Sequence, residues 1–156
     1  MKRFSLRQVK PASIETGFPE LINAAIFNDD DSINNHVFSQ YYSSKEILDW
    51  FNENISFILN EVEPTFLPKA NCLAEAIEMF YRSLSDDDLD NGHFDSMLDT
   101  LFEYKTRHDL KFAFRGTDIP NVFLGVYRGH LTVSWQESDT YVLSTLYEPR
   151  LILQIM

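Results

Sequence analysis

The spacing of apolar side chains changes near residue 110 of the chain. Before that point, apolar residues recur every three or four positions, which is the period of an amphipathic helix. In the segment 44–60, for example, one helical face is formed by Ile47, Phe51, Ile55 and Ile58. The period predicts four helices, at residues 18–27, 44–60, 70–84 and 92–105.

After residue 110, apolar and polar residues alternate, as they do in a strand with one buried face. LKFAFR has this pattern, and NVFLGVY, a short RG turn and HLTVSW together predict a β-hairpin. TYVLSTLY and the terminal LILQIM continue the pattern, and RFSLR near the N-terminus adds a candidate strand. We therefore predict an α+β fold in which N-terminal helices pack on a C-terminal antiparallel sheet at about 110–155. Residues 28–35, NDDDSINN, are expected to form a polar link.

Length and composition favour one globular domain over residues 1–156, because 44% of the residues are hydrophobic. Cys72 is the only cysteine, so an intrachain disulfide is excluded and a reducing compartment is favoured. The basic N-terminus lacks the apolar stretch of a secretory signal, and no apolar run approaches the roughly 20 residues of a membrane span. We expect a cytoplasmic protein that does not contact membranes.

The net charge of −11 is concentrated in the middle of the chain. Residues 11–104 contain 19 Asp and Glu but only three Lys and Arg. Nucleic-acid phosphates would be repelled by such a segment, whereas a basic protein would be attracted. The charge therefore argues against direct nucleic-acid binding and favours a cationic protein partner.

The most acidic stretch, LSDDDLDNGHFD at residues 84–95, comes close to two metal motifs. An EF-hand that starts at Asp86 has Asn91 at its glycine position, and one that starts at Asp87 aligns Gly92 but lacks the closing glutamate. The stretch also spells DDxxD, the magnesium motif of prenyl-transferring synthases, which are much larger and carry a second copy. We predict no metal and no cofactor here. The alternative is a solvated connection whose acids favour the next helix N-terminus.

No catalytic site is predicted from the sequence. The chain has no HExxH, CxxC or GxSxG motif and no glycine-rich phosphate loop. His130 is expected to be exposed on a strand, and Ser134 is expected to point outward by alternation. A histidine beside several carboxylates, His93, leaves open a site assembled around it and the nearby aspartates.

The candidate partner-binding residues are therefore the acidic runs and the aromatic pair beside them. Exposed aromatic residues next to carboxylates are common at protein interfaces. The candidates are Asp29, Asp30, Asp31, Tyr41, Tyr42, Asp86, Asp87, Asp88 and Asp90.

The compact single domain, the acidic FNDDD and SDDDLD runs and the hairpin PNVFLGVYRGHLTVSW carry a resemblance to a known class. In these features the chain resembles the immunity proteins of bacterial polymorphic toxin systems, including those of contact-dependent growth inhibition. The resemblance implies a cytoplasmic, non-catalytic protein that binds and neutralises one cognate toxin domain. We also expect the free protein to be a monomer. A basic, nuclease-type toxin would suit the acidic surface. Two alternatives stay open: an adaptor or assembly protein of a phage or secretion system, and an enzyme built around His93.

Overall fold

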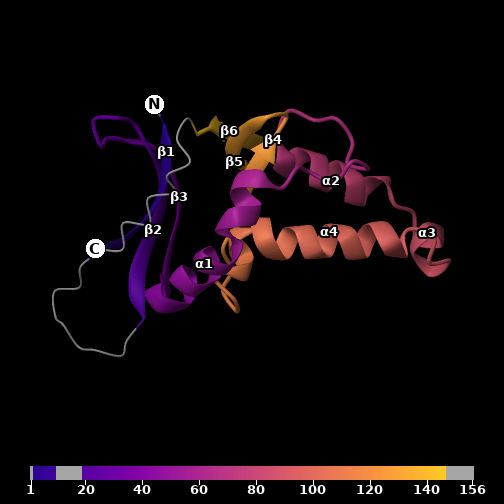
Figure 1. The fold of residues 1–156 in the computed structure, drawn as a ribbon, viewed down its shortest axis with the longest axis horizontal. Coiled ribbons are helices and arrows are strands. Elements are labelled where there is room, and N and C mark those ends of the chain that lie inside the picture. The colour runs from indigo at the N-terminus through magenta and orange to yellow at the C-terminus, as the bar shows by residue number, and fades with distance from the viewer. Residues whose placement is uncertain (1, 10–18, 147–156) are drawn as a thin grey trace.

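The computed structural model describes residues 2–9 and 19–146, which contain two separate three-stranded antiparallel sheets (Figure 1). The first sheet has the order β1-β2-β3 and the second the order β4-β5-β6. The strands are β1 (Arg3–Val9), β2 (Glu20–Phe27), β3 (Ile33–Tyr42), β4 (Val122–Tyr127), β5 (His130–Glu137) and β6 (Thr140–Thr145).

The helices lie between the two sheets in the sequence. They are α1 (Ser44–Asn60), α2 (Leu73–Ser83), α3 (Asp86–Asp90) and α4 (Asp95–His108), followed by the short 3₁₀ helix η1 (Leu110–Phe112). Ser43 caps α1 by accepting a hydrogen bond from the Glu46 amide, the contact that its sequence spacing predicts. The predicted helices at 44–60, 70–84 and 92–105 are thus confirmed, with boundaries that shift by up to three residues.

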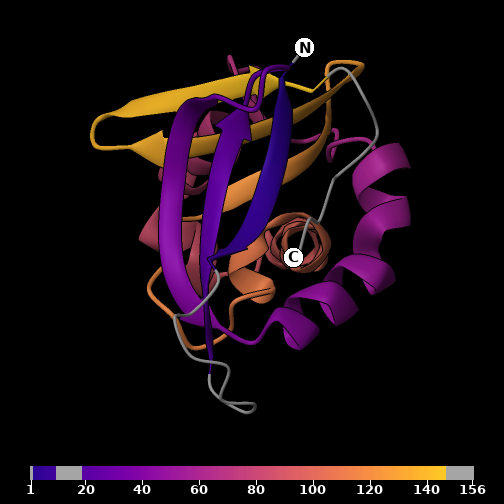
Figure 2. The same cartoon turned by 90° about the vertical axis from the view of Figure 1, so that its left-hand side faces the viewer.

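The sheet β4–β6 is the central layer of the molecule, because both of its faces are buried. Val122 and Leu124 of β4 belong to the core shared with β1–β3 and α1, whereas Phe123 and Tyr127 belong to a second core shared with α2 and α4. Figure 1 shows β1–β3 at one end of the longest axis and the helices α2 and α4 on the other side of β4–β6. In Figure 2, which faces β1–β3, the strands of the second sheet cross behind those of the first and α1 lies beside them.

The predicted helix at 18–27 is wrong, because Glu20–Phe27 form β2, the middle strand of the first sheet. Residues 24–27 are all buried, so the strand reads as a continuous apolar run that periodicity cannot distinguish from a helix. The predicted polar link at 28–35 is also too long. Its second half begins β3, which the sequence pattern did not indicate. Strands therefore precede the helices, in contrast to the predicted order.

The C-terminal prediction is confirmed in part. β4 and β5 form the expected hairpin around Arg128 and Gly129, both of which have positive φ, and β6 adds the next strand. LKFAFR is not a strand: Asp109 caps η1, and Leu110 and Phe114 turn into the core. RFSLR forms β1 as expected. The predicted end of the sheet, residues 147–155, lies outside the described residues.

Candidate functional site

Within the acidic stretch at 84–95, Asp86–Asp90 form the short helix α3, whose N-terminus is capped by side chains of the stretch itself. Ser85 Oγ accepts a hydrogen bond from the Asp88 amide at 3.1 Å, and the Asp88 carboxylate accepts one from the Ser85 amide at 3.0 Å. This reciprocal capping box satisfies two amides that would otherwise lack partners. Hydrogen bonds from Ser85 lower the pKa of Asp88, so its carboxylate stays ionised.

The helix that follows, α4, is anchored mainly by its second half, and in its first half Leu98 is partly buried against the second core. Leu101, Tyr104 and His108 are its buried residues, and the Trp50 indole of α1 donates a hydrogen bond to the Thr106 carbonyl at 3.0 Å. The first turns of α4 have no buried residue. Figure 1 shows α3 and the start of α4 at the far end of the longest axis, away from β1–β3. We call residues 85–100 the acidic arm.

The acidic arm carries negative charge that the described chain does not neutralise. It contains six aspartates and no lysine or arginine. Within residues 2–9 and 19–146, no ion pair joins any of these aspartates to a cation. Five of them are exposed, namely Asp86, Asp87, Asp90, Asp95 and Asp99. The arm is therefore a local source of negative potential.

The acidic arm also exposes apolar side chains. Leu89 of α3 is 48% exposed and Met97 of α4 is 38% exposed. Apolar side chains surrounded by charged ones are the usual arrangement at protein interfaces, because the apolar groups supply contact area and the charges orient the partner. The arm can thus offer a cationic protein both kinds of contact.

The second predicted acidic run, residues 29–31, has a different environment. It forms the β2–β3 turn, where Asp31 has positive φ and its carboxylate pairs with the guanidinium groups of both Arg3 and Arg7. Asp30 accepts hydrogen bonds from the amide and hydroxyl of Ser32, and these bonds lower the pKa of Asp30. This run is therefore bound largely by its own sheet.

The two candidate tyrosines also differ in their surroundings. Tyr41 is 62% exposed, whereas Tyr42 packs against Phe114 of the core with ring centroids 5.3 Å apart. Both lie at the end of β3, in the sheet opposite the acidic arm in Figure 1. The structure thus groups Asp86, Asp87, Asp88 and Asp90 together and places the other candidates elsewhere.

The histidine and serine predictions have mixed outcomes. His130 is exposed as expected, and His93 is exposed in the turn between α3 and α4. Ser134 does not point outward: it is fully buried, and its hydroxyl accepts a hydrogen bond from the Ala74 amide at 3.1 Å. Alternation failed there because α2 covers the face that would otherwise be solvated.

The sequence pattern does not indicate a partly buried ion cluster, because its members lie 46 and 47 positions apart. Arg107 donates two hydrogen bonds to Glu61, at 2.9 and 2.6 Å. The ring nitrogens of His108 face Glu61 Oε2 at 2.8 Å and the Leu124 carbonyl at 2.7 Å. Burial alone would raise the pKa of Glu61, but the bonds from Arg107 and His108 outweigh it and lower that pKa. The cluster joins the end of α1 to α4 and β4.

Among the described residues, no three His, Cys, Asp or Glu side chains converge in a group that could hold a metal ion, and no helix is long and apolar enough to cross a membrane. Comparison with known proteins found no similar family model, no similar curated protein and no similar solved structure.

Proposed function

We propose that the chain is an immunity-type inhibitor that binds a basic toxin domain through the acidic arm. The observation that carries this proposal is the contrast between the arm and the rest of the surface. Five exposed aspartates project from one end of the molecule without a cation of the described chain beside them. A nuclease has a cationic cleft because its substrate is a polyanion, and clustered carboxylates can occupy such a cleft in place of phosphates.

The charged and the apolar side chains of the arm would affect different steps of binding. The exposed carboxylates would accelerate the encounter with a cationic partner, because electrostatic steering acts on the association rate. Leu89 and Met97 would lose water on contact and so slow dissociation. Cytoplasmic location belongs to the same proposal, because the inhibitor would have to be where the toxin acts. A non-catalytic role belongs to it as well, because binding alone would neutralise the toxin.

The test is protection from a toxin encoded beside this chain. The polypeptide encoded directly upstream is expressed in a bacterial host with and without the chain. We expect growth arrest that the chain relieves. Absence of arrest, or arrest that the chain does not relieve, would reject the proposal.

The arm is tested by measuring the association of the purified chain with the same toxin domain, using the variant Asp86→Asn, Asp87→Asn, Asp90→Asn and Asp99→Asn. Asp88 is left unchanged because it caps α3. A control variant removes the same charge from exposed acids elsewhere: Glu53→Gln, Asp118→Asn, Glu137→Gln and Asp139→Asn. We expect the arm variant to associate about tenfold more slowly at low salt and to converge with the parent near 1 M salt. Equal loss in both variants would show that only total charge matters.

A further inference from the structure

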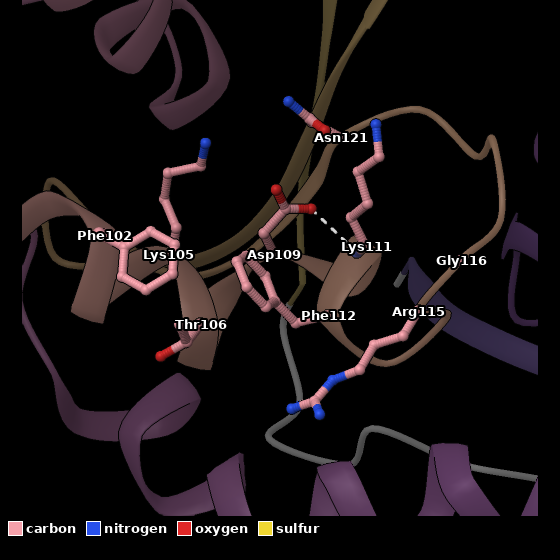
Figure 3. A pocket seen from close by; sticks show the side chains of 9 residues that line it. All are labelled: Phe102, Lys105, Thr106, Asp109, Lys111, Phe112, Arg115, Gly116 and Asn121. Carbon is pink, nitrogen blue, oxygen red and sulfur yellow. Dashed lines mark hydrogen bonds between the residues drawn. The ribbon is translucent and has the colours of Figure 1, made fainter.

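A pocket of about 670 Å³ lies beside the C-terminal end of α4 (Figure 3). Its walls come from α4, from η1 and from the loop that leads to β4. Sites for small organic ligands have volumes of about 300–1,000 Å³, so the pocket is large enough for one.

Three cations line this pocket of an otherwise acidic protein. They are Lys105, Lys111 and Arg115, and none of them forms an ion pair with a described residue. Lys105 instead lies over the Tyr81 ring, 5.3 Å from its centroid. Figure 3 shows the amines of Lys105 and Lys111 on the same side of the pocket, whereas the Arg115 guanidinium points away from them. An anion that binds between the two lysines would reduce their mutual repulsion.

The pocket also contains one carboxylate, that of Asp109, which is only 1% exposed. Its Oδ1 accepts a hydrogen bond from the Lys111 amide at 3.0 Å, and in Figure 3 it lies between the side chains of Lys105 and Lys111. Burial raises the pKa of Asp109 to about 6, against the opposing effect of these neighbours. Its charge reduces the positive potential of the pocket without cancelling three cations.

Two aromatic rings form the apolar side of the pocket. Phe102 and Phe112 contact each other edge to face, with centroids 5.9 Å apart. Phe102 is 59% exposed, so its ring has surface available to a ligand. Exposed aromatic rings beside cations are the usual means of holding a planar base next to its phosphates.

We propose that this pocket binds a small organic anion in which a phosphate group is attached to a planar ring, that is, a ligand of the nucleotide class. Lys105 and Lys111 would contact the phosphates, Arg115 would add positive potential at the rim, and Phe102 would stack on the ring. This site is distinct from the acidic arm, so either proposal can fail without the other.

The experiment is calorimetric titration of the whole chain with ATP, AMP and pyrophosphate as separate probes. We expect one site that binds ATP more tightly than pyrophosphate. Replacing the cations by Lys105→Met, Lys111→Met and Arg115→Gln should weaken ATP binding by about tenfold or more, since charge-assisted contacts to phosphate are lost. The exposed pair Lys69→Met and Arg128→Gln is the matched control and should leave ATP binding unchanged.

Two further variants keep the proposal falsifiable if the triple variant folds poorly. Phe102→Ala should weaken ATP binding several-fold and leave pyrophosphate binding unchanged. Asp109→Asn removes the single carboxylate of the pocket and should tighten the binding of ATP and of pyrophosphate. No binding of any probe at millimolar concentration would overturn the proposal. So would equal binding of ATP and pyrophosphate that Phe102→Ala does not alter.

Discussion

The two acidic runs of the chain, at residues 29–31 and 86–90, have similar compositions and opposite environments. In the β2–β3 turn, Asp31 pairs with arginines that β1 supplies from across the sheet. In α3, only Asp88 is engaged, and its partner is the neighbouring Ser85. A run of carboxylates therefore keeps its negative charge unpaired only where the fold brings no cation of the described chain to it.

Glu61 is the extreme case of a carboxylate held by its own chain. Glu61→Gln should lower the free energy of unfolding by about 2–4 kcal/mol, because Arg107 and the buried His108 would lose an anionic acceptor. Glu103→Gln on the exposed side of α4 is the control and should change stability little. Chemical denaturation at pH 7 measures both. Equal stability of the two variants would mean that the cluster contributes nothing to folding.

Asp109 differs both from the paired carboxylates and from the exposed ones, because it is buried but forms no ion pair with a described residue. Its pKa of about 6 in the folded protein is above the ordinary 3.8, so the folded state binds the proton more tightly than the unfolded state. Its ionisation should therefore cost on the order of 1–3 kcal/mol of stability as the pH rises from about 4 to about 7. The measurement is the pH dependence of unfolding in the parent and in Asp109→Asn. The variant should gain relative to the parent across this range, and parallel curves would contradict the prediction.

A substitution at Asp31 tests the acidic run at residues 29–31, in which this carboxylate is paired with arginines. Asp31→Asn should destabilise the protein by about 0.5–1 kcal/mol at low salt, because two partly exposed arginines lose their partner. Asparagine tolerates the positive φ of this position, so the change isolates the charge. Asp139→Asn, in the exposed β5–β6 turn, is the matched control. The difference between the two variants should shrink at 1 M salt, and its persistence there would argue against an electrostatic origin.

The acidic arm should give the smallest effect on stability. The four-aspartate variant of the arm should keep its thermal midpoint within about 2 °C of the parent or exceed it slightly, because exposed like charges are removed and the α3 cap is retained. Thermal unfolding at low salt checks this. A large loss would mean that these carboxylates hold the helices together and are not available to a partner.

Much of the helical architecture follows from the sequence alone. The stripe of Ile47, Phe51 and Ile58 and the Ser43 cap locate α1 without any tertiary information. The β4–β5 hairpin is equally local, because its turn needs residues that accept positive φ and Gly129 provides one. The sequence also predicts the dense negative charge of residues 84–95 and their position between two longer helices, but not the short helix α3 within them.

Only the tertiary structure determined whether a residue faces solvent or the core, and which charged side chains pair with each other. β2 is a strand because β1 and β3 supply hydrogen bonds on both sides, and its apolar residues suit either a buried strand or a helix. Ser134 is buried because α2 covers it, and Glu61 meets His108 only when α1 and α4 pack together. Periodicity reports contacts within one helix or strand, whereas these pairings join residues of different elements, up to 60 positions apart. Their energies depend on distances in space that no local pattern encodes.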